Sequence, residues 1–239
     1  MLGYQQHRLR QGRRPATVNS EVGTLKHILK EGLKRGAITA LPEIEHIPQG
    51  RRSVDIPTEG EIMRLIDAAP KRLQVLIGFL TETGCRRGEA LNLTWDSIDE
   101  QERFATIEPR EGWTPKTAAS QRRLPLSDGL LAALLELPRT GPYVFPGRDP
   151  AKPMTNFRRS LASSVKAAGL VRNGKPMRIT PHLIRKANAT WLATRGVHPR
   201  VLQSLLGHSP GSRITDQHYV QSTDEALRQA AISLPVWGP

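Results

Sequence analysis

Hydrophobic residues recur at helical spacing over long parts of this chain, as in helices that bury one face. The first such run predicts a helix that begins at Thr17 and ends at Gly36, with its apolar face at Val18, Val22, Leu25, Leu29 and Leu33. Residues 37–57 are rich in proline and poor in apolar positions, which predicts a linker. Residues 1–16 are polar and basic, so we expect an arm there.

A larger domain is predicted over residues 51–239. It opens with a capping box formed by Thr58 and Glu61, directly before an apolar run. A second apolar helix, Leu73–Thr83, ends at Gly84, and glycine is the residue most typical of a helix C-terminus. The same spacing predicts further helices at residues 87–93, 127–137, 155–168, 181–195, 198–206 and 222–232.

Two stretches of the larger domain, residues 103–108 and 122–126, have the composition of strands and are joined by a long polar connection. The predicted fold class is therefore mostly α with a small antiparallel β-sheet (α+β). Residues 1–50 contain one good helix and cannot bury much core, so we expect them to rest on DNA or on a partner.

The charge balance narrows the function. Thirty-five Lys and Arg residues stand against 22 Asp and Glu, a formal net charge of +13 that attracts polyanions. Nucleic acid is the favoured partner, although a ribosomal-type protein or an ordinary basic protein has the same balance. The single cysteine, Cys85, excludes a disulfide framework and a cysteine-based zinc site. No apolar run has the length of a membrane span or a signal core, so we expect no membrane partner and a cytoplasmic location.

One basic segment, residues 178–219, concentrates side chains suited to chemistry on a phosphodiester. His182 and Arg185 share one face of a predicted helix, and His208 and Tyr219 follow. Cations hold a phosphate, and a tyrosine hydroxyl attacks it. Because Asp and Glu are scattered, we expect guanidinium groups rather than metal ions to stabilise the transition state, and no metal or cofactor is predicted. Taken singly, each histidine and the tyrosine is an ordinary capping or packing residue.

Four features in a fixed order resemble the tyrosine recombinases, the lambda-integrase family. The first is Thr83–Leu91, which reads Thr-Gly-Cys-Arg-Arg-Gly-Glu-Ala-Leu. The others are His182–Arg185, then Leu205–Ser209, and finally Tyr219. The match runs over roughly residues 58–220, most of the chain, and only the joint occurrence of the four features carries the resemblance.

The resemblance implies a set of residues around the scissile phosphate. Arg86 and Arg185 would clamp its nonbridging oxygens, and His182 would act as a proton carrier and phosphate ligand. His208 would hydrogen-bond the phosphate or orient it. Tyr219 would be the nucleophile that forms a 3′-phosphotyrosyl bond.

Supporting residues follow from the same resemblance. Lys116, in the connection between the two strands, would protonate the 5′-oxygen leaving group, and Glu89 would support the active site. Two departures from the family are visible: Lys186 stands where histidine is common, and the interval between the second histidine and the tyrosine is longer than in the commonest members. Contacts to DNA are expected from Arg87, Arg122, Arg123 and Lys186.

The implied function is a site-specific DNA recombinase (integrase) that cleaves and rejoins duplex DNA without metal or ATP and has no small-molecule substrate. The family forms homo-tetramers on paired sites, and the tail helix at residues 222–232 is expected to dock on a neighbouring protomer, with packing on its own domain as the alternative. Residues 1–50 resemble part of a helical core-binding domain, either truncated or naturally short. Two alternatives stay open: a catalytically silent DNA-binding relative and a type IB topoisomerase.

Overall fold

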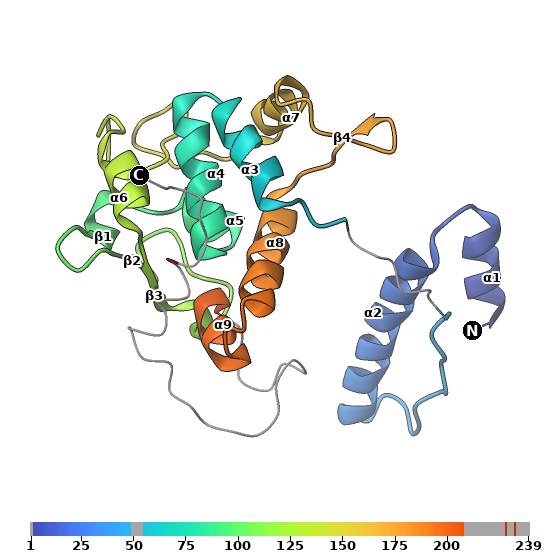
Figure 1. Ribbon diagram of the computed structural model, residues 1–239. Coiled ribbons are helices and arrows are strands. Elements are labelled where there is room, and N and C mark those ends of the chain that lie inside the picture. Colours follow the sequence, from blue (N-terminus) through green and yellow to red (C-terminus); the bar gives the residue numbers. More distant parts are fainter. Residues whose placement is uncertain (1, 49–54, 208–227, 229–231, 233–239) are drawn as a thin grey trace. The chain divides into compact units, whose positions relative to one another are not determined.

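The structure of the protein is a computed structural model that describes residues 2–48, 55–207, 228 and 232. The chain divides into two compact units, Met1–Asp55 and Ile56–Pro239 (Figure 1). Among the described residues, the smaller unit is built from two helices, and the larger unit holds a three-stranded sheet, a short hairpin and the other helices.

In the smaller unit, α1 (Leu2–Arg10) and α2 (Pro15–Lys34) pack against each other. The sequence pattern predicts an arm where α1 lies. The contacts between the two helices are polar: the Tyr4 hydroxyl donates to Glu21 at 3.0 Å, and Arg8 pairs with the same carboxylate. A helix held in this way has little apolar periodicity, so hydrophobic spacing does not reveal it.

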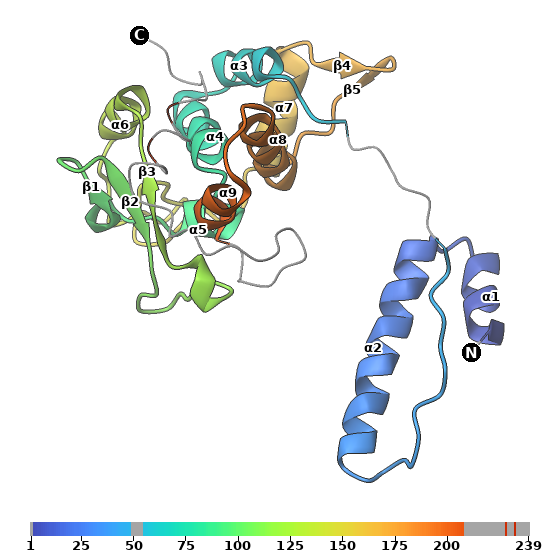
Figure 2. The ribbon, with the colours of Figure 1, turned by 60° about the horizontal axis from the view of Figure 1, so that its bottom comes forward.

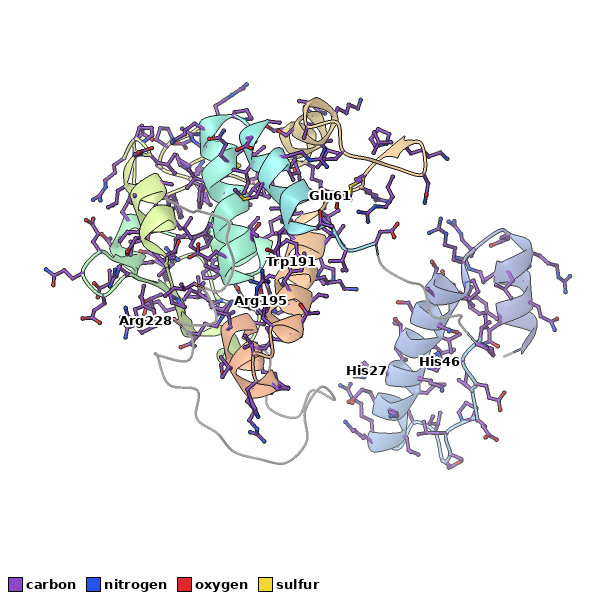
Figure 3. The ribbon with its side chains drawn as sticks, viewed as in Figure 1. His27, His46, Glu61, Trp191, Arg195 and Arg228 are labelled. Atoms are coloured by element: carbon purple, nitrogen blue, oxygen red, sulfur yellow. The ribbon has the colours of Figure 1, made fainter. Side chains whose placement is uncertain are left out.

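The segment after α2 is packed, whereas the sequence predicts a linker. Residues 37–48 run back along α2, with His27 on the helix and His46 on the returning segment (Figure 3). Both polar atoms of the Asn19 side chain bind the backbone of Ile47 at 2.8 Å. Ile44 is buried with two valines of α2. The prolines keep this segment extended, and side chains from α2 satisfy part of its backbone.

Helix α4 (Lys71–Thr83) is at the centre of the core of the larger unit, and every residue from Val75 to Thr83 is buried. Several helices of the described chain pack on it, and three of them can be followed in both views of the ribbon (Figures 1 and 2). These are α3 (Glu59–Asp67), α6 (Asp128–Leu135) and α8 (Pro181–Thr194). The predicted capping box at Thr58 begins α3.

The small sheet has the order β1-β2-β3, and neighbouring strands are antiparallel. Its strands are β1 (Ile98–Asp99), β2 (Phe104–Ile107) and β3 (Arg122–Pro125). A hairpin, β4 (Val171–Arg172) with β5 (Lys175–Pro176), was not predicted; each of its strands has two residues, too few for a strand pattern. The predicted class, mostly α with a small antiparallel sheet, is confirmed.

The remaining helices lie where the hydrophobic spacing of the sequence predicts them, within a few residues at each end. They are α5 (Arg87–Leu91), α7 (Arg158–Ala167) and α9 (Pro199–Leu206). None of the described helices is long and apolar enough to cross a membrane.

The tail helix predicted at residues 222–232 lies outside the described residues except for two positions, Arg228 and Ile232. Arg228 lies beside the sheet (Figure 3) and donates to the backbone carbonyl of Glu102 at 2.8 Å. Its guanidinium lies 4.5 Å from the centre of the Phe104 ring, and that of Arg123 lies 4.0 Å from the same ring. Arg123, for which we expect a DNA contact, is half-buried in this stack.

The buried carboxylate of Glu82 binds Ser127, the N-cap residue of α6. Its oxygens accept hydrogen bonds from the backbone N–H of Ser127 at 2.6 Å and from the Ser127 hydroxyl at 2.8 Å. Burial raises the pKa of Glu82 to about 7, although the hydrogen bonds from Ser127 oppose the rise. Between about pH 4.5 and pH 7, the folded protein therefore keeps a proton on Glu82 that the unfolded chain releases.

This proton makes stability depend on pH. We expect the free energy of unfolding to fall as the pH rises from about 4.5 to about 7, because the unfolded carboxyl ionises first. For one proton the slope approaches about 1.4 kcal/mol per pH unit. Urea unfolding of wild type and Glu82→Gln across this range measures it, since glutamine keeps an acceptor but does not titrate. Parallel curves for the two proteins would contradict the assignment.

Candidate functional site

The site begins at the end of α4, where Gly84 adopts a left-handed conformation with φ of +59°. A Cβ atom at this position would lie 2.5 Å from Oδ1 of Asn188, so only glycine fits. Arg86 follows as the N-cap residue of α5, and its backbone N–H donates to Glu89 at 2.8 Å. The turn therefore fixes the point from which the Arg86 side chain leaves the backbone.

The Arg86 guanidinium joins three separate parts of the chain. Nη1 donates to Oε1 of Glu89 at 2.7 Å and to Oγ of Ser120 at 2.8 Å. Nη2 donates to the carbonyl of Gly207 at 3.0 Å. With 30% of the side chain exposed, Arg86 is held from within and still reaches solvent. Such a group is already oriented before any ligand arrives.

Glu89 is buried and shared by two arginines. Its Oε2 accepts from Nη2 of Arg122 at 2.9 Å, while Oε1 accepts from Arg86. Burial acts to raise the pKa of this carboxyl, but the charge of Arg122 and the hydrogen bonds from Arg122 and Arg86 outweigh burial and lower the pKa. Glu89 is therefore ionised at neutral pH and holds both arginines in place.

Arg122, for which we expect a DNA contact, faces the interior, and its side chain is 8% exposed. All three guanidinium nitrogens donate within the protein. Nε donates to the carbonyl of Leu205 and Nη1 to that of Ser120, both at 2.7 Å, and Nη2 pairs with Glu89. The burial of its side chain places Arg122 for contacts inside the protein rather than for a direct contact with DNA.

Arg185, on α8, is buried and joins the ends of two other helices. Nη1 donates to the carbonyl of Gly84 at 2.8 Å, and Nη2 donates to that of Leu206 at 2.7 Å. Burial, together with the positive charges of Arg86 and Arg122, lowers the pKa of Arg185 to about 10. Arg185 remains charged at neutral pH, although burial and the neighbouring arginines make its charged form less favourable than in water.

The arginine cluster, defined as Arg86, Arg122 and Arg185, thus contains three cations near one another. Glu89 offsets one of the three charges. The remaining repulsion is relieved when an anion binds, and a guanidinium fork matches two oxygens of a phosphate. The electrostatics of the site therefore favour a bound phosphate group.

Lys116 is exposed in the connection between β2 and β3. The residue after it, Thr117, has its hydroxyl oxygen 2.9 Å from that of Ser120. Because Ser120 also accepts a hydrogen bond from Arg86, the turn that carries Lys116 is tied to the arginine cluster.

His182 and Lys186 are exposed on α8, one turn apart. His182 lines a cavity of about 470 Å³ together with three arginines, Arg87, Arg158 and Arg178. Arg87, for which we expect a DNA contact, is exposed at the first position of α5. These three arginines form a second group of cations, which surrounds His182.

Two predicted residues, His208 and Tyr219, lie outside the described residues. The chain leads toward them from Gly207, whose carbonyl accepts from Arg86. The Cys85 thiol is buried, and burial followed by the nearby charge of Glu89 raises its pKa to about 12. Cys85 is therefore a core residue.

Two further polar residues of the site were missed by the sequence reasoning. Ser120 has no periodic pattern around it that marks its burial. Asn188 lies three positions after Arg185 on the same face of α8, and this helical spacing could have identified it. Its Nδ2 donates to the carbonyls of Thr81 at 2.8 Å and Glu82 at 3.0 Å, at the end of α4.

Comparison with known proteins agrees with this geometry. A profile of the phage integrase family matches residues 57–226. The tyrosine recombinase XerA of Pyrococcus furiosus is 28% identical over 90% of this chain and 72% of its own length. The tyrosine recombinase XerD of Corynebacterium glutamicum is 29% identical over 87% of this chain and 69% of its own length.

Solved structures share the fold. The Tn1549 transposon integrase in complex with a circular intermediate DNA superposes with a TM-score of 0.74 at 20% identity, covering 97% of this chain and 83% of that chain. A lambda integrase tetramer bound to a Holliday junction superposes with a TM-score of 0.65 at 19% identity, covering 92% and 66%. The boxes in the sequence, the arginine cluster and the family match agree, and the chain belongs to the phage integrase family of tyrosine recombinases.

Proposed function

We propose that this protein is a site-specific DNA recombinase that cleaves and rejoins duplex DNA through a covalent bond to Tyr219. The arginine cluster is the observation that carries the proposal, because mutual repulsion and burial prepare it for a phosphate. The excess of basic residues attracts the rest of the DNA backbone. Family membership supports the same reaction.

The reaction follows from the chemistry of the groups. The hydroxyl oxygen of Tyr219 attacks the phosphorus, a new P–O bond forms, and the bond to the 5′-oxygen breaks. The charge that develops on the nonbridging oxygens is stabilised by Arg86 and Arg185. His182 takes the proton that the Tyr219 hydroxyl loses and binds the phosphate, His208 hydrogen-bonds or orients the phosphate, and Lys116 gives its proton to the departing 5′-oxygen. The phosphotyrosyl bond conserves the energy of the phosphodiester, so rejoining needs no ATP.

The exposure of the described residues suits these roles. The groups that clamp the phosphate are held by the core: Arg185 is buried and Arg86 is 30% exposed. The groups that would move protons, Lys116 and His182, are exposed. Fixed cations cost little reorganisation during the reaction, whereas a proton carrier must reach both the DNA and the solvent.

Assembly on DNA is part of the proposal. A lambda integrase tetramer was solved on a Holliday junction, and the Tn1549 integrase on DNA, so we infer that this chain also acts as a homo-tetramer on paired duplex sites. The contacts of Arg228 with Glu102 and Phe104 support docking of the tail on its own domain. Docking on a neighbouring protomer would use the same surface after these contacts break.

Covalent trapping tests the nucleophile. Wild-type protein incubated with fragmented DNA and then denatured in detergent is expected to carry a nucleotide adduct on Tyr219. Tyr219→Phe should carry none, while the matched control Tyr143→Phe should carry as much as wild type. Peptide mass spectrometry locates the adduct, and sequencing the attached DNA identifies the site. DNA binding without any adduct would favour a catalytically silent relative.

Arg185→Ala tests the phosphate clamp. We expect cleavage to fall by about 10² to 10³-fold, because one set of transition-state donors is lost, with DNA binding retained. The variant also leaves the carbonyls of Gly84 and Leu206 without this donor, which is expected to cost about 1–3 kcal/mol of stability.

The matched control is Arg195→Ala, at the end of the same helix, where the arginine pairs with Glu59 and is partly exposed. Single-turnover cleavage and a gel-shift assay separate chemistry from binding. Loss of binding together with unfolding of Arg185→Ala would argue that the residue is structural.

Chelation tests the source of the positive charge. Because the arginine cluster supplies fixed cations at the phosphate, we expect cleavage in excess EDTA to match cleavage in Mg²⁺. The adduct yield of wild-type protein measures this directly. Strict dependence on Mg²⁺ would contradict a mechanism that relies on arginine alone.

A further inference from the structure

The side chain of Ser120 lies where the arginine cluster meets the turn that carries Lys116. Ser120 is fully buried. Its Oγ accepts from Nη1 of Arg86 at 2.8 Å and lies 2.9 Å from the hydroxyl oxygen of Thr117. Its backbone is engaged as well: the carbonyl accepts from Arg122 at 2.7 Å, and the N–H donates to the carbonyl of Thr117 at 3.0 Å.

These contacts make a short chain of hydrogen bonds from Arg86 through Ser120 to Thr117, which follows Lys116 directly. A serine hydroxyl has two lone pairs and one proton, so it can bind Arg86 and Thr117 at the same time. Neither an alanine nor an apolar residue of similar size can do both. The backbone next to Lys116 is therefore positioned with respect to Arg86 through one buried hydroxyl.

We propose that Ser120 is a positioning residue that couples the phosphate clamp, Arg86, to the proton donor, Lys116. The inference rests on the proposed function, since it needs Arg86 on the scissile phosphate and Lys116 near the leaving oxygen. A lysine ammonium is a point charge on a flexible stem, so its distance from the leaving oxygen depends on where its backbone is held. Misplacement by about 1 Å can cost about 10²-fold in rate.

The test compares two leaving groups in single-turnover cleavage of a nicked duplex that carries the sequence recovered from the Tyr219 adduct. One duplex has the normal 5′-oxygen, and the other has sulfur in its place. A thiol has a pKa of about 8.5, far below that of an alcohol, so sulfur departs as a thiolate without being protonated. A defect in proton donation therefore appears with oxygen and disappears with sulfur.

Ser120→Ala is expected to cleave the oxygen substrate about 10- to 100-fold more slowly than wild type. On the sulfur substrate its rate should return to within about threefold of wild type, as should that of Lys116→Ala. Thr117→Val removes the other hydroxyl of the link but keeps the contact between Ser120 and Arg86, and it should show the same pattern.

The matched control is Ser164→Ala, which removes another buried serine hydroxyl, one that donates to the carbonyl of Ser160 within α7 at 3.0 Å. It should leave both rates unchanged. A loss by Ser120→Ala of equal size on both substrates would overturn the proposal, because the serine would then act on Arg86 or on the fold alone. Absence of any loss would overturn it as well.

Failure of the proposed function gives a different result. In that case wild-type protein forms no adduct on any DNA, and the coupling through Ser120 is rejected together with the proposed function. If wild type cleaves and only the sulfur rescue is missing, the coupling alone is wrong.

Discussion

The pairing of one buried carboxylate with two arginines is the interaction on which the site depends. Glu89 binds Arg86 through one oxygen and Arg122 through the other, and burial together with the charges of these two arginines lowers the pKa of Arg185. Two unit charges about 4 Å apart interact by about 4 kcal/mol at an effective dielectric constant of 20. Glu89 offsets one of the three positive charges, so the cluster retains an excess of positive charge.

The same residues hold the helices together. The last turn of a helix leaves carbonyl groups without partners in the helix, and α8 supplies the missing donors to the end of α4. Asn188 binds the carbonyls of Thr81 and Glu82, and Arg185 binds that of Gly84. Since Gly84 precedes Arg86 by two positions, packing of α8 on α4 sets the place of the first arginine. The groups proposed to bind the phosphate therefore also hold the helices together.

Much of the fold was predictable because helical spacing is a local property. The apolar face of residues 62–66 and the run before Gly84 both identified helices, and the structure confirms them. The exceptions are elements without such a face. Helix α1 is held by Glu21, and residues 37–48 by Asn19, so partners distant in sequence decide their structure. The two-residue strands of the β4–β5 hairpin are too short to show any pattern.

For the site, the sequence by itself predicts which residues carry the chemistry and in what order they come, because Arg86, His182 and Arg185 stand in local boxes that resemble those of the family. Only the tertiary structure decided what those residues touch. The bond from Arg86 to Gly207 joins positions 121 residues apart, and no local pattern encodes it. The inward direction of Arg122 and the link through Ser120 were decided in the same way. Spacing along the chain reports which face of a helix is buried, whereas the partner of a buried polar group depends on which distant element packs against it.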